Sequence, residues 1–187
     1  ERVASHRLVH SRSSFTPFGV KRGSHGVKLT CIDHTRTSVR VKPTQVRFRR
    51  GSKPSVELSG QRDWTGVLGA VSEDGEEFYC QSDEYITAEH ARKFILALSN
   101  EFDEDLLVVL DGAPYFRASK VTELEDRDDL EFVQLPAYSP DMNPVEECWR
   151  QLKASLKNRF FEDLDELKRA IQCGLDDIAT PDASNYL

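Results

Sequence analysis

Three acidic residues of this 187-residue chain stand where a side chain could do chemistry. Asp33 is the last residue of a predicted strand over 27–33, and Asp111 directly follows the apolar run 106–110. Glu146 lies near the start of a predicted helix. A charged side chain at the end of a buried strand must be solvated, paired or bound to a metal, so these acids are candidates for a functional site.

Two aspartates at strand ends and a nearby helical glutamate would make an all-oxygen cluster. Open α/β sheets bind their ligands at the carboxyl ends of strands. Oxygen ligands suit Mg²⁺ or Mn²⁺ and do not suit zinc. Two such ions about 3.5–4 Å apart can activate a water and stabilise the leaving oxygen in phosphodiester cleavage.

Each acid also has an ordinary structural explanation, and the residues alone leave it open. Asp33 could be a turn aspartate, and Asp111 could open an Asp-Gly turn. Asn143, Pro144 and Glu146 fit the N-cap, N1 and N3 positions of a capping box. Spacing does not show that the three acids meet.

The hydrophobic pattern predicts strands first and helices later. We expect an antiparallel meander of strands at 27–33, 37–42, 45–50, 64–71 and 77–80. After it we expect helices at 87–100, 118–125, 143–160 and 164–178, with strands at 106–110 and 130–135. This order predicts an α/β domain whose mixed sheet, an antiparallel meander followed by parallel strands, is flanked by helices.

The formal net charge of −7 hides an uneven distribution. Residues 1–60 carry 13 Lys and Arg but only three acidic residues, which points to a polyanion partner for this half. The longest apolar runs have about five residues, whereas a membrane span needs about 20, so no membrane partner is expected. Four cysteines without a CxxC motif indicate free thiols in a reducing cytoplasm.

Two groups of basic residues are candidate DNA contacts. The first shares the predicted face of Glu146, beside the carboxylates, where a phosphate backbone would run: Arg150, Lys153 and Lys157. The second lies on or just after the predicted third strand: Arg47, Arg49, Arg50 and Lys53. The alternatives are a solvated helix face and a charge-protected edge strand.

Two segments closely resemble the catalytic core of DDE transposases. They are VVLDGAP at 108–114 and LPAYSPDMNPVEECWRQLK at 135–153. The match is to the mariner superfamily, in its bacterial and archaeal insertion-sequence branch, and the 34 residues between Asp111 and Glu146 are typical of it. The stretches CIDHTRTSV, RRGSKP and SGQRDWTGVLGA also resemble this family. An acidic composition with 16 Arg against nine Lys resembles versions from salt-loving archaea.

The resemblance implies a ribonuclease-H-like fold over 27–187, preceded by an arm at 1–26 that is poorly ordered or degenerate. It implies that Asp33, Asp111 and Glu146 are the catalytic residues and the ligands of two Mg²⁺ or Mn²⁺ ions. The implied activity is cleavage and strand transfer at transposon ends. The implied partners are double-stranded DNA of the ends and of the target, and a second copy of the chain assembled on DNA. The implied location is the cytoplasm, at the nucleoid.

The chain also departs from the family pattern. His34 follows the first aspartate, where the family often has an acid or an amide. Gly112 follows the second, where Asn is common, and Phe116 stands near a usual His. No helix-turn-helix region resembling the family's is found, so we expect a truncated copy or an isolated catalytic domain.

Two alternative functions stay open, and the missing helix-turn-helix region motivates the first of them. One is a catalytically silent remnant that binds DNA or a partner transposase without cutting. The other is a general ribonuclease-H-like nuclease that takes no part in transposition. Mn²⁺-dependent nicking by the chain would exclude the first, and a preference for RNA–DNA hybrid would favour the second.

Overall fold

The structure is a computed structural model, and it describes residues 15–17, 27–39, 64–102, 104–136, 139–159 and 161–186. Within these residues the backbone forms a six-stranded sheet with the order β1-β4-β3-β2-β5-β6. The strands are β1 (Phe15–Pro17), β2 (Val27–Ser38), β3 (Trp64–Ser72), β4 (Glu77–Ser82), β5 (Asp105–Leu110) and β6 (Leu130–Gln134). β2, β3 and β4 pair antiparallel in sequence, while β5 and β6 run parallel to β2. The predicted meander followed by parallel strands is therefore confirmed.

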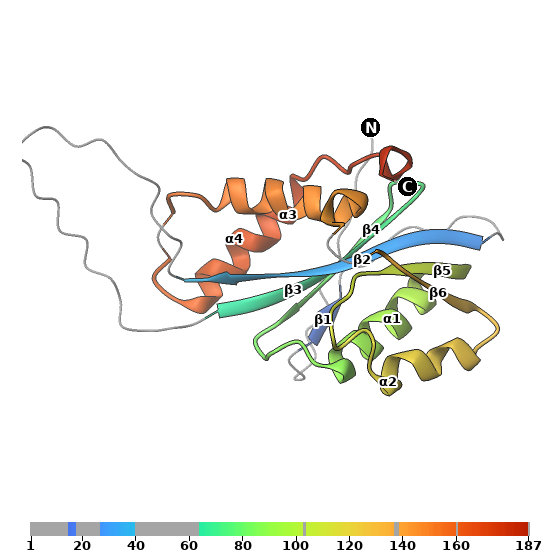
Figure 1. The fold of residues 1–187 in the computed structure, drawn as a ribbon. Coiled ribbons are helices and arrows are strands. Elements are labelled where there is room, and N and C mark those ends of the chain that lie inside the picture. Colours follow the sequence, from blue (N-terminus) through green and yellow to red (C-terminus); the bar gives the residue numbers. More distant parts are fainter. Residues whose placement is uncertain are drawn as a thin grey trace, which may run out of the picture.

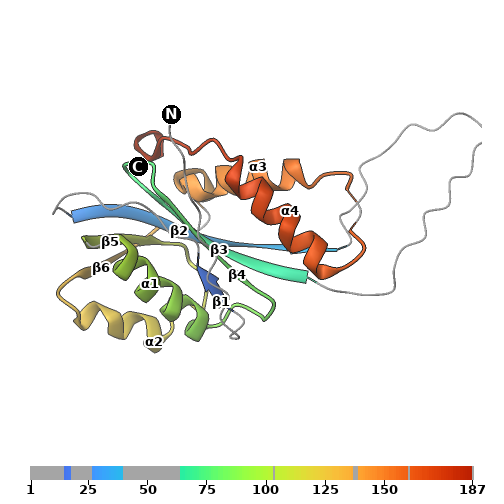
Figure 2. The same cartoon turned by 180° about the vertical axis from the view of Figure 1, so that it is seen from behind.

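Helices cover both faces of this sheet. The helices are α1 (Ala88–Phe102), α2 (Ser119–Thr122), α3 (Pro144–Ser155) and α4 (Leu164–Asp176), and the short 3₁₀ turns are η1 (Glu123–Asp126), η2 (Pro140–Met142) and η3 (Ala183–Asn185). α3 and α4 lie on one face, and α1 and α2 lie on the other (Figure 1). Figure 2 shows the same two layers from behind. None of the helices in this part of the chain has the length and apolar character that a membrane crossing needs.

Each helix layer buries an apolar stripe against the sheet. Trp149 and Leu152 of α3 and Leu167 and Ile171 of α4 are buried in one cluster with residues of β2, β3 and β5. The stripe of α1 is buried in a second cluster on the other face. β5 lies between these layers, which explains its nearly continuous apolar sequence.

β2 is longer than the sequence pattern suggests. The prediction that a strand ends at Asp33 and a second one begins at Thr37 is wrong, because β2 continues without a break to Ser38. Its pairing with β3 runs from Thr30, opposite Ser72, to Ser38, opposite Trp64. The backbone of β3 therefore keeps the polar second half of β2 extended, a contact that local sequence does not reveal.

Two further bounds differ from the sequence prediction. α3 ends at Ser155 rather than 160, and Asn158 then adopts a left-handed conformation with φ of 61°. Phe15–Pro17 belongs to the predicted arm, yet its backbone pairs antiparallel with β4. The predicted strand 45–50 lies outside the described residues.

Candidate active site

The register between β2 and β5 places Asp33 and Asp111 side by side. The last paired residues of these parallel strands are Cys31 and Val109. Asp33 comes two residues later within β2, and Asp111 comes two residues later directly after the end of β5. If the strand alternation continues one residue past β5, both side chains point toward the face that α3 covers. Asp33 is only 6% exposed, and Asp111 is half-buried.

Glu146 reaches this place from the first turn of α3. The Asn143 side chain caps the helix by accepting a hydrogen bond from the Val145 N–H at 3.1 Å. Its amide Nδ2 donates to the Ile32 carbonyl at 3.3 Å, which fixes the helix start to β2. The Asn143 backbone N–H donates to the Pro140 carbonyl and not to Glu146. The N-cap is thus confirmed, but the capping box does not explain Glu146.

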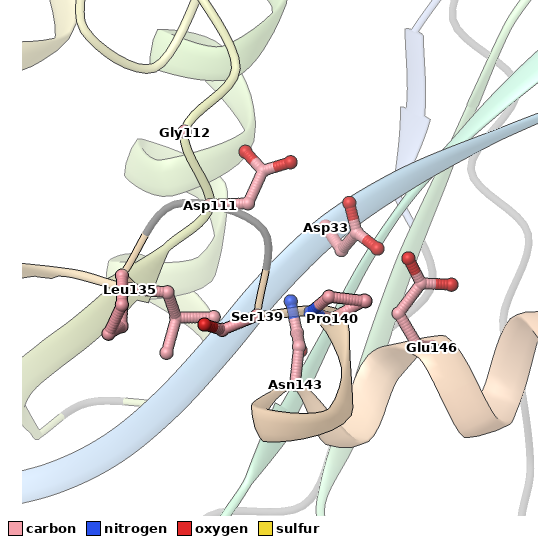
Figure 3. Close-up of a pocket in the computed structure, with 9 residues that line it drawn as sticks. Asp33, Asp111, Gly112, Leu135, Ser139, Pro140, Asn143 and Glu146 are labelled. Carbon is pink, nitrogen blue, oxygen red and sulfur yellow. The ribbon is translucent and has the colours of Figure 1, made fainter.

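One cavity of about 170 Å³ collects the three acids. It is lined by Asp33, Asp111, Gly112, Leu135, Pro136, Ser139, Pro140, Asn143 and Glu146. In Figure 3 the acids come from three separate elements, and the Glu146 carboxylate lies toward Asp33. The three carboxylates border the cavity without converging on one point: within the described residues, no three His, Cys, Asp or Glu side chains form a group that could hold a metal.

Burial dominates the electrostatics of Asp33. It raises the pKa of this carboxyl to about 7, and the charges of Glu146 and Asp111 act in the same direction. Two hydrogen bonds oppose the shift: the His34 backbone N–H donates to Oδ1 at 2.6 Å, and the Trp149 indole donates to Oδ2 at 3.1 Å. Asp33 is therefore held in place but disfavoured as an anion, a state that a nearby cation would reverse.

Gly69 makes room for the indole that contacts Asp33. It lies opposite Asp33 in the pairing of β2 with β3. A Cβ atom at this position would lie 2.6 Å from Cη2 of Trp149, closer than carbon atoms approach. Trp149 is only 1% exposed, and its hydrogen bond to Asp33 is a site contact that the sequence reasoning does not include. Its spacing of three residues from Glu146, within one helix turn, was the available signal.

Asp111 combines a turn with its place in the cavity. Its Oδ1 accepts a hydrogen bond from the Ala113 N–H at 3.0 Å, which stabilises the turn after β5. The turn suggested by the sequence is present, and Asp111 nevertheless lines the cavity. A local hydrogen bond and a functional position are compatible for this residue.

A second interaction, between His34 and Tyr115, adjoins the acids. The Tyr115 hydroxyl lies 2.5 Å from Nδ1 of His34, and the rings pack edge to face with centroids 5.3 Å apart. Burial lowers the pKa of His34, while Asp111 acts in the opposite direction. Burial and the charge of Asp111 raise the pKa of Tyr115. The two directions favour a hydrogen bond between a neutral phenol and a neutral imidazole at neutral pH, in which the imidazole tautomer sets the donor.

Comparison with known proteins decides the family. The sequence profile of the DDE superfamily endonuclease family matches residues 28–168, about three quarters of the chain. The chain belongs to this family. A search of curated proteins finds no match.

Solved structures with the same fold include several of Mos1 transposase. The mariner Mos1 paired-end complex with Mg superposes with a TM-score of 0.65 at 16% identity, covering 85% of this chain and 50% of that one. For the Mos1 strand transfer complex the TM-score is 0.62 at 16% identity, covering 82% and 48%. For the Mos1 catalytic domain alone it is 0.59 at 14% identity, covering 84% and 73%. The likeness shows a ribonuclease-H-like α/β fold, and this chain spans about half the length of the Mos1 chains in the complexes.

The three basic residues predicted to share the face of Glu146 have different surroundings in the structure. Arg150 is engaged with Glu147, whose Oε2 accepts from Nε at 2.6 Å. Lys157 lies in the turn beyond the end of α3, so the helical spacing that linked it to Glu146 does not apply. Lys153 is exposed on α3 and contributes to the lowered pKa of His34, after burial.

The second basic group cannot be placed. Arg47, Arg49, Arg50 and Lys53 lie outside the described residues. Of the seven predicted DNA contacts, Arg150 and Lys153 are exposed on α3, and Arg150 in addition pairs with Glu147.

Proposed function

We propose that this chain is the catalytic domain of a transposase, a divalent-metal-dependent DNA endonuclease and strand transferase that acts on transposon ends. The observation that carries the proposal is the meeting of Asp33, Asp111 and Glu146 around one cavity in a DDE endonuclease domain. The Mos1 structures of the same fold include a paired-end complex with a left transposon end and complexes with Mg and with Mn.

The donor set fits divalent cations. All three acids offer carboxylate oxygens, the ligands that Mg²⁺ and Mn²⁺ prefer. Within the described residues, none of the three forms a salt bridge with Lys or Arg, whereas many other acids do. Asp33, Asp111 and Glu146 would hold two ions, which supply an activated water and stabilise the leaving oxygen of the phosphodiester.

The surrounding residues prepare the acids for this task. Trp149 and the His34 backbone fix both oxygens of Asp33, so its carboxyl does not need to reorient during the reaction. Asn143 holds the start of α3 on β2 and thereby the position of Glu146. Lys153 would contact the DNA backbone next to the reacting phosphate.

The finer assignments rest on the sequence resemblance. The proposed catalytic unit is 27–187, with 1–26 as an arm, and the family branch is that of bacterial and archaeal insertion sequences. We assign double-stranded transposon ends and target DNA as substrates, handled by a homodimer assembled on DNA at the nucleoid. Arg47, Arg49, Arg50 and Lys53 are proposed to contact that DNA together with the residues of α3.

Nicking of supercoiled plasmid DNA in Mn²⁺ tests the proposal without knowledge of the end sequence. We expect the wild-type chain to nick, and Asp111→Asn and Glu146→Gln to lower the nicking rate at least about 100-fold because each removes a charge that holds the cations. The matched control is Glu147→Gln, which changes the adjacent glutamate that binds Arg150 outside the cavity. It should nick at the wild-type rate.

Other outcomes would contradict parts of the proposal. Normal nicking by either Asp111→Asn or Glu146→Gln would exclude the mechanism. A folded wild-type chain that does not nick in Mn²⁺ would favour the silent remnant. Faster cleavage of RNA–DNA hybrid than of duplex DNA would favour a general nuclease.

A further inference from the structure

The hydrogen bond between Tyr115 and His34 crosses the point where β2 and β5 separate. Parallel pairing ends at Cys31 and Val109, after which β2 continues along β3 and the chain turns away at Asp111. Between β2 and residues 111–118, this is the one side-chain hydrogen bond that the described residues contain. Beyond the last paired residues, the segments that carry Asp33 and Asp111 are thus joined by a single side-chain hydrogen bond among the described residues.

Short contacts connect this pair to both aspartates. On one side, Asp111 accepts from the Ala113 N–H, and the Phe116 N–H donates to the Ala113 carbonyl at 3.1 Å. The Phe116 ring is buried and packs against Tyr115 with centroids 4.7 Å apart. On the other side, the His34 backbone holds Asp33. A displacement of Tyr115 is therefore transmitted to the separation of the two acids.

The pair acts from outside the cavity. Successive residues of a strand point to opposite faces, so the His34 side chain leaves β2 on the face opposite to Asp33. Neither His34 nor Tyr115 lines the cavity. Their effect on a bound ion must pass through Asp33 and Asp111.

We propose that Tyr115 and His34 are positioning residues that fix the gap between Asp33 and Asp111 and so set which size of divalent cation the site prefers. This inference rests on the metal site of the proposed function. Mg²⁺ requires short bonds of about 2.0–2.1 Å in a strict geometry, whereas Ca²⁺ accepts about 2.3–2.6 Å in flexible sites. A gap held at one width discriminates between ions of different size, and a loosened gap lets the larger ion compete.

Competition between two ions measures this effect without any DNA. Mn²⁺ binding to the 187-residue chain is followed by electron paramagnetic resonance, and Ca²⁺ is then titrated as competitor. Tyr115→Phe removes only the hydroxyl. We expect its Mn²⁺ affinity to fall about 10-fold, the scale known for groups that orient metal ligands, with a smaller loss for Ca²⁺. Tyr85→Phe, the same change at a residue that is 67% exposed, is the matched control and should bind as wild type does.

A double-variant cycle tests whether the two residues act as one unit. His34→Phe keeps a ring against Tyr115 but lacks the nitrogen that forms the hydrogen bond. If the hydrogen bond is the cause, the double variant binds Mn²⁺ no more weakly than either single variant. Urea unfolding of each variant separates this from general destabilisation, which would lower the free energy of unfolding and leave the ratio of Mn²⁺ to Ca²⁺ affinity unchanged.

The outcomes distinguish this inference from the function on which it rests. If wild type binds Mn²⁺ and Tyr115→Phe keeps the wild-type ratio of affinities, the positioning role is overturned and the metal site stands. If the wild-type chain binds no Mn²⁺, the metal site is overturned and the positioning role with it.

Discussion

Two positions on β2, one near its start and one at its middle, differ in how clustered carboxylates are neutralised. Near its start, Lys28 is only 3% exposed, and its ammonium pairs with Glu76 and lies 3.3 Å from Asp74 and 3.4 Å from Glu104. Five residues further along the same strand, Asp33 lines a cavity with two further acids, and none of the three has a salt-bridged cation among the described residues. One cluster contains its own positive charge and the other does not.

The difference separates a structural charge cluster from a functional one. Burial lowers the pKa of Lys28, but hydrogen bonds to Glu76 and Asp74 outweigh it and the net shift is upward, so the lysine stays charged. The pKa of Asp33 is also raised, but for an acid this means that the charged form is disfavoured. The cluster at Lys28 is neutralised within the protein, whereas the cluster at Asp33 would, on the proposed function, take its cation from solution.

The largest expected effect comes from removing the internal cation. Lys28→Met leaves the nearly buried carboxylate of Glu104 without its partner, so the free energy of unfolding should fall by about 4 kcal/mol in urea titrations. The Mn²⁺ affinity of the proposed site at Asp33, Asp111 and Glu146 should stay unchanged. Lys93→Met, at a lysine whose side chain is 54% exposed, is the control and should change stability by less than about 1 kcal/mol. If Lys28→Met lowers the free energy of unfolding by no more than Lys93→Met does, the cluster at Lys28 does not depend on its internal cation.

The second effect depends on pH. The charged form of Lys28 stabilises the fold, whereas the charged form of Asp33 destabilises it in the absence of metal. The pKa of Asp33 is raised from 3.8 to about 7, so the folded chain binds more protons than the unfolded chain between these values. The free energy of unfolding of the metal-free wild type should therefore fall as pH rises from about 4 to about 7, by about 4 kcal/mol in total, and then level off. Asp33→Asn should lack this decrease.

Urea unfolding in EDTA at several pH values measures the decrease. Addition of Mn²⁺ at pH 8 should restore stability to wild type and not to Asp33→Asn, because a bound cation favours the ionised carboxylate. Parallel pH curves for the two proteins would contradict the account of Asp33.

A smaller effect tests how the packing of Trp149 against Gly69 supports Asp33. In Gly69→Ala the new methyl group would collide with the Trp149 ring, which must move away from Asp33. We expect a loss of about 2 kcal/mol in the free energy of unfolding, together with weaker Mn²⁺ binding. The control is Gly66→Ala on the same strand, where the nearest atoms lie at 3.4 Å. Equal effects of the two substitutions would show that Trp149 does not depend on Gly69.

Local patterns predicted the elements that are buried on a regular face. The apolar stripe of α3 and the run of β5 were identified because burial repeats at the period of a helix or fills both faces of a strand. The end of β2 was misplaced, since its residues from His34 onward are polar and only the distant partner β3 keeps them extended. Pairing between residues far apart in sequence leaves no local signature.

The same limit applies to the candidate site. Asp33, Asp111 and Glu146 were found because each carries a charge next to a predicted element and a motif around it. Tyr115 and His34 are 81 residues apart, and the sequence around each of them does not predict their hydrogen bond. His34 was noticed only as a departure from the family pattern.

The register of β2 against β5 has a consequence for how copies of such a gene decay. β5 reads Asp-Leu-Leu-Val-Val-Leu, so deletion of one codon within it still leaves apolar side chains on both faces of a strand buried between two layers. The same deletion turns Asp111 to the opposite face and out of step with Asp33, because the side-chain period of a strand is two. A single in-frame codon loss in this strand is thus a route to a chain that folds, accumulates and has lost its chemistry.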